Sequence, residues 1–465
     1  MADGAWRNWA GNQTAAPHHV LTPRSAGEVA AAVHFAADQG LAVRMAGSGH
    51  SFTPAAVTDG LLLLPGGLTR VRSVDAEAGL VTVEAGCPLR VLNETLLTHG
   101  LALANLGDIQ EQTVAGAIQT GTHGTGRDSG GIAAQVAGLE LVLADGTVAT
   151  CSATERPRGG PPDARTPAST ERPFCGPPDA RAPASTERPE LLSAAAVGLG
   201  TLGILTAVTF RVVPAFLLEA REQPMGWDEV TRRLDELTTE NEHFEFYWFP
   251  HTGNCLTKRN NTSPGPARPL TPARKWLDDE FLSNTVFGLA NQLGHRVPAA
   301  IRPVNRLAAR ALGSRTYVDA SHRVYTSPRR VRFKEQEYAV GREQLPAALA
   351  GLRELFRTRD WRISFPIEVR VSPTDDLWLS TAHGRSSGYI ACHVFHASPH
   401  QPYFRDVEAM LTELGGRPHW GKLHTRDAAY LSTVYPKFAD FAALRDQLDP
   451  GRRFANAYTR RVLGD

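Results

Sequence analysis

Two glycine-rich segments in the first third of the chain each carry a histidine. The first is Gly47-Ser-Gly-His50-Ser-Phe52, and the second runs from Asn105 to Gly126 and contains His123. Because glycine has no Cβ, such segments let backbone N–H groups approach a diphosphate closely. The neutral imidazole of His50 is also a nucleophile that can form a covalent bond. Either segment alone is explained by ordinary turns, but with a third glycine cluster, Gly198 to Gly203, they indicate a nucleotide-cofactor site.

A second set of reactive side chains lies in the last quarter of the chain. Glu368 and Arg370 are two residues apart in a segment of alternating polarity, which places both on one face of a strand. His393 offers an imidazole that accepts protons near pH 7. Lys422, in His419-Trp-Gly-Lys422, offers a cation that stabilises a developing alkoxide. The alternatives are an exposed ion pair, a core histidine and a solvated lysine.

A metal centre is not predicted. The five cysteines are odd in number, widely spaced and without a C-x-x-C pair, which predicts mostly buried thiols. Four histidines of the C-terminal part lack the compact spacing that structural zinc prefers. They are His393, His396, His419 and His424.

Bulk composition excludes several classes of partner. The 465 residues are 42% apolar and 21% charged, which predicts a large core and more than one domain. Lys and Arg number 49 against 48 for Asp and Glu, so no bulk field attracts nucleic acid or an anionic membrane. The N-terminal residues carry no secretion signal and no apolar run is long enough for a bilayer span, which predicts a cytoplasmic protein.

Local patterns place the first glycine turn in an α/β domain. Ser25 and Glu28 form a capping box for a helix over 26–39, and a strand over 41–45 leads into the turn. Hairpins are predicted at 71–84 and 136–151. The dinucleotide fingerprint G-x-G-x-x-G with an acid about twenty residues later is absent, which disfavours a Rossmann fold.

The chain duplicates a segment rich in proline and charge, 158–173, in the next sixteen residues, 174–189. This tandem insertion, 158–189, has little apolar surface to bury and predicts a disordered loop without a catalytic role. The predicted domains are 1–214, containing the insertion, and 215–425, followed by a tail over 426–465.

The second domain shows longer amphipathic helices between alternating strands. Helices are predicted over about 226–240, 343–356 and 403–413, and strands over 243–249, 364–371 and 389–396. This order predicts an α+β domain in which helices cover an antiparallel sheet.

Four motifs in order resemble those of the sugar-1,4-lactone oxidases and alditol oxidases, which are flavoenzymes of the vanillyl-alcohol-oxidase type. They are Gly47 to Phe52, Val114 to Gly126, Gly198 to Gly203 and His419 to Lys422. The resemblance covers nearly the whole chain outside the insertion. It implies a PCMH-type FAD-binding domain of two α/β subdomains and a substrate domain like that of D-arabinono-1,4-lactone oxidase.

The resemblance implies FAD joined covalently to His50 through the 8α-methyl group of its ring. A second covalent bond would need a cysteine near the second glycine segment, and none lies between Cys87 and Cys151. The other residues implied to bind the cofactor are Ala46, Gly47, Ser48, Gly49, Ser51, Phe52, Asn105, Gly107, Asp108, Thr113, Gly116, Gly121, Thr122, His123, Gly126, Gly198, Gly203 and Ile204.

The same resemblance implies the roles of the reactive set. Arg370 supports negative charge on the reduced flavin, and Glu368 orients the sugar hydroxyls or helps hold the base. His393 accepts the hydroxyl proton, and Lys422 lies at the substrate hydroxyl. Hydride passes to flavin N5, and oxygen then reoxidises the flavin to give hydrogen peroxide.

Two positions narrow the expected activity. Gly107 stands where related dehydrogenases carry alanine, which favours oxygen as acceptor. Asp108 stands where alditol oxidases carry serine, which disfavours a linear polyol. Residues 243–251 and 258–261 are more similar to the lactone oxidases, which favours a lactone of the L-gulono, D-arabinono or L-galactono type. The alternatives are an alditol or other carbohydrate oxidase, a lactone dehydrogenase with another acceptor, and a flavin-binding protein without turnover.

Overall fold

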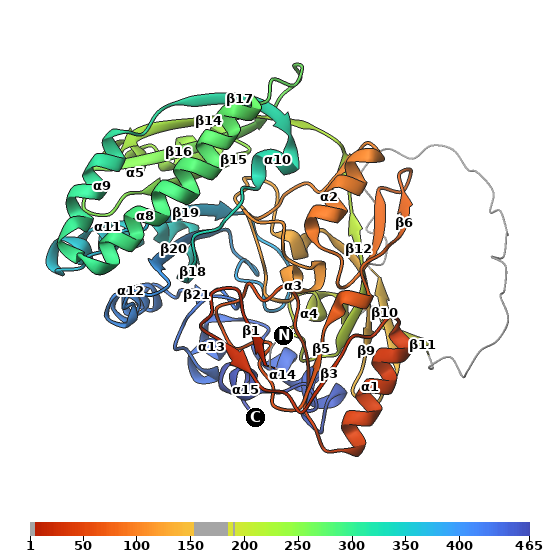
Figure 1. The fold of residues 1–465 in the computed structure, drawn as a ribbon. Coiled ribbons are helices and arrows are strands. Elements are labelled where there is room, and N and C mark those ends of the chain that lie inside the picture. The colour runs from red at the N-terminus through yellow and green to blue at the C-terminus, as the bar shows by residue number, and fades with distance from the viewer. Residues whose placement is uncertain (1–4, 153–184, 189–190) are drawn as a thin grey trace.

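The computed structural model describes residues 5–152, 185–188 and 191–465. Most of the predicted tandem insertion, 158–189, lies outside these described residues. The disordered-loop prediction is wrong at its end, because β11 (Ser185–Glu187) pairs with β10 (Val148–Ser152). Three sheets organise the chain, and helices cover them (Figure 1). Among the described residues, no helix is both long enough and apolar enough to cross a membrane.

A small parallel sheet carries the first glycine turn. Its strands are β3 (His19–Leu21), β5 (Leu61–Leu63) and β4 (Val43–Met45), in that order, and helix α1 (Ala26–Asp38) follows β3 in the chain. The capping prediction is half right, because Ser25 accepts from the Glu28 N–H at 3.1 Å while the Glu28 carboxylate accepts from the Arg24 N–H. Strand β4 ends at Met45 and delivers the chain directly into the turn at Gly47.

A six-stranded sheet carries the second glycine segment. Its order is β11 (Ser185–Glu187), β10 (Val148–Ser152), β9 (Val136–Val142), β12 (Ile204–Arg211), β7 (Leu80–Glu84) and β6 (Val71–Asp75). The β6–β7 and β9–β10 pairs confirm both predicted hairpins. Helices α2 (Leu89–Thr98), α3 (Val114–Gln119) and α4 (Leu192–Ala195) lie beside this sheet.

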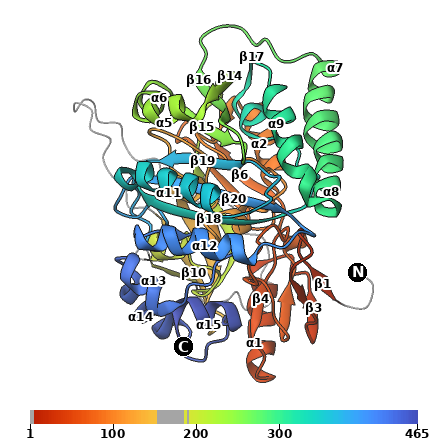
Figure 2. The same cartoon turned by 90° about the vertical axis from the view of Figure 1, so that its left-hand side faces the viewer.

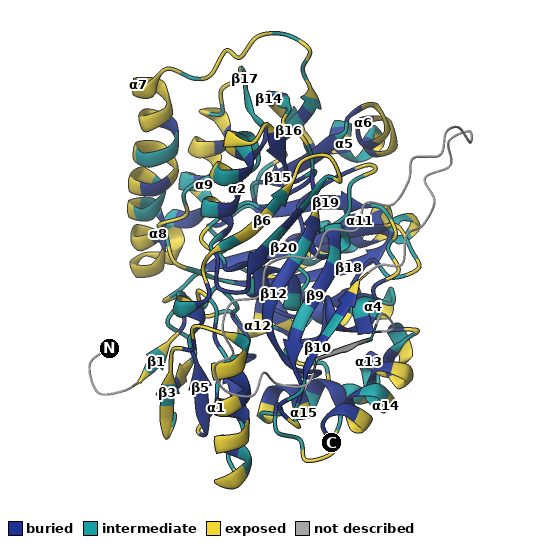
Figure 3. Ribbon diagram, turned by 90° about the vertical axis from the view of Figure 1, so that its right-hand side faces the viewer, coloured by how far each residue is buried: buried dark blue, intermediate teal, exposed yellow. Residues whose placement is uncertain are grey.

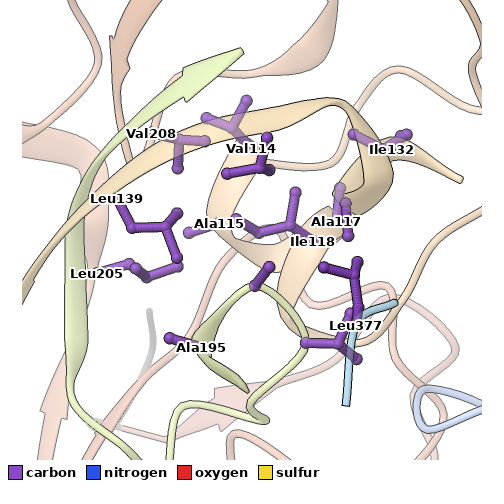
Figure 4. Close-up of a cluster of buried hydrophobic side chains, with 14 of the residues drawn as sticks. Val114, Ala115, Ala117, Ile118, Ile132, Leu139, Ala195, Leu205, Val208 and Leu377 are labelled. Carbon is purple, nitrogen blue, oxygen red and sulfur yellow. The ribbon is translucent and has the colours of Figure 1, made fainter. Parts of the chain in front are cut away.

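Helix α3 is fixed by its apolar residues. Val114 and Ile118 on the helix pack with Leu139 of β9 and with Leu205 and Val208 of β12 in one buried cluster (Figure 4). Burial of each such side chain contributes about 1.5–3 kcal/mol. The helix therefore holds the second glycine segment firmly against the sheet.

The third sheet has eight strands, and every pairing in it is antiparallel. Its order is β17 (Arg315–Ala320), β14 (Leu217–Gly226), β16 (Asn254–Thr262), β15 (His243–Trp248), β19 (Ile367–Ser372), β20 (Ser387–Phe395), β18 (Phe333–Gly341) and β21 (Arg417–Pro418). The strands predicted over 243–249, 364–371 and 389–396 are β15, β19 and β20.

Helices pack on this sheet through a large apolar cluster. They are α5 (Trp227–Arg232), α6 (Leu234–Glu240), α11 (Leu345–Thr358) and α12 (Gln401–Glu413). The prediction of one helix over 226–240 is wrong in one respect, because the chain leaves helical geometry at Arg233 and forms two helices. The sheet and its helices confirm the predicted α+β arrangement.

One long helix was not predicted from the sequence. It consists of α7 (Pro272–Lys275), a π-helical stretch (Trp276–Val286) and α8 (Phe287–Arg296), and α9 (Ile301–Arg310) follows it. These helices lie at one edge of the molecule (Figure 2).

The C-terminal tail returns to the first glycine turn. Helices α13 (Ala428–Val434), α14 (Phe438–Leu448) and α15 (Ala457–Leu463) lie below the large sheet (Figure 1). The buried Arg44 donates to the Phe454 carbonyl at 2.7 Å, and Asn456 donates to the Val57 carbonyl at 2.8 Å. Short strands complete the fold: β1 (Trp6–Arg7), β2 (Thr14–Ala15), β8 (Leu101–Ala102) and β13 (Val213–Pro214), with helix α10 (Ser321–Tyr325) after β17.

The thiol prediction is confirmed where the structure describes it. Cys87, Cys151, Cys255 and Cys392 are buried. Cys175 lies outside the described residues.

Candidate active site

A cavity of about 910 Å³ opens between the glycine segments. Its lining combines the first turn, the start of α3 and the start of β12, which approach from three separate parts of the chain. A Cβ at Gly47 would lie 2.5 Å from Thr113 Oγ1, so only glycine allows this approach. The predicted cofactor residues in this lining are Gly47, Ser48, Gly49, His50, Ser51, Thr113, Gly116, Gly203 and Ile204.

The N-terminal segment holds the His50 turn in place. The Trp9 ring stacks on the His50 ring with centroids 5.5 Å apart, and the Trp9 N–H donates to the Gly49 carbonyl at 2.8 Å. Gly49 has a φ of 72°, a conformation that favours glycine. Burial lowers the pKa of His50, and Lys422 adds to this effect against the opposing charge of Glu111. The imidazole is therefore neutral near pH 7, the form in which an imidazole nitrogen is a nucleophile.

A second cavity of about 730 Å³ meets the first at His50. Four residues line both cavities: His50, Ser51, Gln112 and Thr120. The second cavity is lined by all four residues of the predicted reactive set, which are Glu368, Arg370, His393 and Lys422. The structure thus brings these four side chains to one space and places His50 at its junction with the glycine-lined cavity.

Arg370 lies at the centre of a group of buried carboxylates. Its Nε donates to Glu245 Oε2 at 2.9 Å, and its Nη2 forms ion pairs with Glu368 and Asp108. The Tyr247 hydroxyl donates to Glu368 Oε1 at 2.7 Å, because β15 places Tyr247 opposite Glu368 in the sheet. The exposed-pair alternative is therefore excluded, since both partners are buried.

This environment shifts the pKa values of Glu368 and Asp108 in opposite directions. Burial, together with the charges of Asp108 and Glu245, raises the pKa of Glu368 to about 7, although Arg370 opposes the shift. Burial also disfavours the carboxylate of Asp108, but Arg370, Arg329 and Lys258 outweigh it and lower its pKa. Glu368 is therefore the acid of this group that changes its charge near neutral pH.

Glu335 of β18 joins Lys422 to His393. It forms an ion pair with Lys422, and its Oε1 lies 3.5 Å from His393 Nε2. His393 Nδ1 lies 3.2 Å from the Pro366 carbonyl, which fixes the proton on Nδ1 and leaves Nε2 facing Glu335. Although burial disfavours the carboxylate, Lys422, the largest of the opposing charges, lowers the pKa of Glu335 to about 2.

Glu337, two residues further along β18, faces the same cavity. Its Oε1 lies 3.3 Å from His123 Nε2, and the His123 ring packs on Tyr389 with centroids 3.8 Å apart. His419 Nδ1 accepts from the Gly421 N–H at 3.0 Å, and burial lowers its pKa to about 3. A neutral His419 thus lines one wall beside His123 and Glu337.

Two groups of side chains have ligand atoms close enough for a cation. Among the described residues these groups are Asp108, Glu245 and Glu368, and His123, Glu337 and His419, each with ligand atoms within 4.8 Å of one another. In the first group Arg370 already pairs with all three carboxylates, so a cation would have to displace it.

The other predicted cofactor residues divide into two sets. The second cavity is lined by Phe52, Gly107, Asp108, Thr122 and His123. Neither cavity is lined by Ala46, Asn105, Gly121, Gly126 or Gly198. Asn105 instead donates to the carbonyls of Thr125, Ser129 and Gly130, which holds the loop after the second glycine segment.

Sequence reasoning missed several residues of the two linings. They include Trp6, Arg44, Gln112, Gln119 and Thr120 in the first and Arg329, Glu335, Glu337 and His419 in the second. The alternation of Glu335 and Glu337 was a usable signal, because it is the pattern that identified Glu368 and Arg370.

Comparisons with known proteins agree with this geometry. The family described as D-arabinono-1,4-lactone oxidase matches residues 208–462, and the family described as FAD binding domain matches residues 17–152. An L-gulono-1,4-lactone dehydrogenase of Mycobacterium tuberculosis is 40% identical over 459 residues, 99% of each chain. An L-gulonolactone oxidase of Bos taurus is 31% identical over 98% of each chain, and an alditol oxidase of a Streptomyces species is 30% identical over 98% of each.

A solved structure shares the fold. The cholesterol oxidase of B. sterolicum superposes with a TM-score of 0.78 at 17% sequence identity, covering 99% of this chain and 96% of that chain. This likeness confirms the predicted fold class, a PCMH-type FAD-binding domain joined to a domain with an antiparallel sheet.

Proposed function

From the premise that this chain belongs to the D-arabinono-1,4-lactone oxidase family of FAD-dependent oxidoreductases, we propose that it oxidises a sugar-1,4-lactone with FAD bonded to His50 and oxygen as acceptor. One observation carries the proposal. His50 lies where the glycine-lined cavity meets the cavity that holds Glu368, Arg370, His393 and Lys422.

The residues of the first cavity fit FAD. Its lining includes Gly47, Gly49, Gly116, Gly200 and Gly203, whose backbone N–H groups a diphosphate can approach without obstruction by a Cβ. The neutral His50 imidazole would suit attack on the flavin methyl group, and His50 lines both cavities. When bound, FAD supplies a two-electron oxidant that takes hydride from a carbinol carbon and is reoxidised by oxygen.

The residues of the second cavity suit a polyhydroxy lactone. The buried Arg370 and the partly buried Lys422 supply positive charge that stabilises developing negative charge. His393 Nε2 accepts the proton of the hydroxyl that is oxidised, and the imidazolium so formed faces the Glu335 carboxylate. Ionised Glu368 accepts hydrogen bonds from the sugar hydroxyls.

The domain boundaries follow from the same proposal. Residues 1–214 hold FAD, residues 215–425 hold the substrate, and the tail over 426–465 returns to the FAD part. The change from β13, which ends at Pro214, to β14 of the large sheet supports the first boundary. The hydrogen bond from Arg44 to Phe454 supports the return of the tail.

Gly107 supports oxygen as the acceptor. It lines the second cavity and stands where related dehydrogenases carry alanine. A lactone dehydrogenase with a different acceptor is the second candidate, because the Mycobacterium tuberculosis relative carries that name.

A panel of sugar-1,4-lactones and alditols, assayed for peroxide release, tests the proposed function. We expect a lactone to give the highest kcat/KM and one peroxide per lactone oxidised. Gly107→Ala should slow oxygen-dependent turnover at least about tenfold, equivalent to ~1.4 kcal/mol, while turnover with an artificial dye acceptor is retained. Dye reduction by the wild type without peroxide would establish the dehydrogenase instead, and no turnover with any compound would reject both.

The charge of Glu368 predicts a specific pH dependence. Its pKa is raised to about 7 by burial, so the carboxylate that accepts substrate hydroxyls is present only above this pH. We therefore expect kcat/KM to rise as the pH increases through 7. In Glu368→Gln this rise should disappear, with kcat/KM at pH 8 lowered roughly 10–100-fold by loss of a charged hydrogen-bond acceptor. An unchanged pH profile in Glu368→Gln would assign the titration to another group.

A further inference from the structure

The long edge helix, which comprises α7, the π-helical stretch and α8, is amphipathic, but its polar side faces the protein and its apolar side faces outward. The residues that it buries against the protein are mostly polar, whereas many of its large apolar residues are exposed. Figure 3 shows exposed residues along the length of α7 and α8. A helix of an ordinary globular protein turns its apolar stripe toward the core.

Polar contacts hold the inner face. Asn284 donates to the Pro328 carbonyl at 3.0 Å and accepts from the Arg330 N–H at 2.8 Å. Further along, Asn291 accepts from the Ser364 hydroxyl at 2.6 Å. These contacts are directional, so they fix which side of the helix faces the protein.

Helix α9 lies beside α8 on the same part of the protein. Its buried Asn305 donates to the Ile363 carbonyl at 3.0 Å, next to the Ser364 that binds α8. Gly294 permits close contact, because a Cβ there would lie 2.8 Å from Ile301. The faces of α8 and α9 opposite these contacts are therefore open on the same side.

The outer face carries a continuous apolar stripe. In the π-helical stretch, residues five apart share one side, and the rings of Trp276 and Phe281 stack with centroids 5.9 Å apart. Trp276, Leu289 and Leu307 are 59%, 63% and 70% exposed. The exposed apolar residues of this surface are Trp276, Leu277, Phe281, Leu282, Val286, Leu289, Leu293, Val297 and Leu307.

The acidic residues at the start of the stripe, Asp278, Asp279 and Glu280, are paired with Arg274, Lys275 and Arg330. Beyond them the charge around the stripe has one sign. From Phe281 to Ser314 the chain has four arginines, Arg296, Arg302, Arg306 and Arg310, and no aspartate or glutamate. Arg302 pairs with Asp360, whereas Arg296, Arg306 and Arg310 are exposed. The near-zero net charge of the whole chain predicts no anionic membrane partner. The net charge of the chain does not reveal that positive charge is concentrated on this surface.

We propose that α7–α9 bind peripherally to the surface of an anionic phospholipid bilayer. The apolar stripe would enter the boundary between headgroups and acyl chains, and the arginines would meet the phosphates. In a twofold contact with a second copy, the acidic residues of the same helix, Asp278, Asp279 and Glu280, would already be paired within each chain. They are therefore poor partners for the exposed arginines, which disfavours that occupant. Apolar side chains flanked by cations suit a lipid surface, since each part contacts its chemical complement.

Cosedimentation of the flavin-loaded full-length protein with vesicles tests the proposal. The vesicles are phosphatidylglycerol and phosphatidylcholine at 3:7, or phosphatidylcholine alone. We expect strong binding only to the anionic vesicles, reduced by high salt. Leu289→Ser/Leu293→Ser/Leu307→Ser and Arg296→Gln/Arg306→Gln/Arg310→Gln should each weaken binding roughly 100-fold.

Matched controls separate binding from folding. Leu21→Ser/Phe35→Ser changes exposed apolar residues elsewhere and should bind vesicles like the wild type. All variants should keep the flavin spectrum and lactone turnover, because these residues line neither cavity. No binding by the wild type, or equal loss in the control, would overturn the proposal. The proposal would also be overturned if light scattering showed a wild-type dimer that the leucine substitutions dissociate, and if the wild type did not bind vesicles.

Discussion

Arg370→Met is expected to lower kcat for lactone oxidation roughly 10²–10³-fold, the usual loss when one preorganised electrostatic group is removed from a buried site. Arg370 is the cation at the centre of Asp108, Glu245 and Glu368. With methionine at this position, the negative charge that develops during the reaction would lie beside three carboxylates and would lack the positive charge of Arg370. Steady-state kinetics at saturating lactone measures this loss.

The same substitution should destabilise the protein. Removing one partner of a buried ion pair costs about 3–5 kcal/mol, because the remaining charges stay buried without compensation. Denaturant unfolding of the flavin-loaded protein measures this cost. Arg330→Met is the matched control, since Arg330 pairs with Glu280 at the exposed surface. A catalytic rate in Arg370→Met close to that of the wild type would show that Arg370 has only a structural role.

His50→Ala is expected to abolish the covalent flavin. After acid precipitation the wild-type pellet should keep yellow fluorescence, whereas the variant should release all its flavin to the supernatant. The glycine-lined cavity remains in His50→Ala, so FAD should still bind before acid treatment, at lower occupancy. His99→Ala, an exposed histidine outside both cavities, is the control. Covalent flavin in His50→Ala would place the tether on another residue.

Local patterns predicted much of the site because the features concerned are local. Glycine turns, primed hairpins and the side-chain alternation of Glu368 and Arg370 depend on neighbours in sequence. The resemblance then ordered these features into one cofactor site. His50 and the four reactive residues line the two adjoining cavities, and their roles stay predictions.

The missed residues depend on contacts between distant segments. Glu335 stands opposite His393 because β18 and β20 pair in a register that neither segment specifies alone. The Trp9 ring stacks on His50 although the two residues are far apart in the sequence. Such partners follow from tertiary pairing, so a local pattern identifies their type but not their neighbours.

The edge helix and α9 show a different limit of prediction from sequence. Periodicity can identify an amphipathic helix, but it does not say which side faces the protein. Here Asn284, Asn291 and Asn305 turn the polar side inward through hydrogen bonds to backbone and to Ser364. The direction of the stripe is therefore a property of the fold, and only the structure reveals it.

Anaerobic mixing of the purified protein with the best lactone of the panel tests the central claim most directly. The visible absorbance of the flavin should bleach at a rate at least equal to kcat. It should return within the turnover time when oxygen is admitted, with release of one peroxide per flavin. A flavin that stays oxidised with every sugar-1,4-lactone would contradict the proposed function.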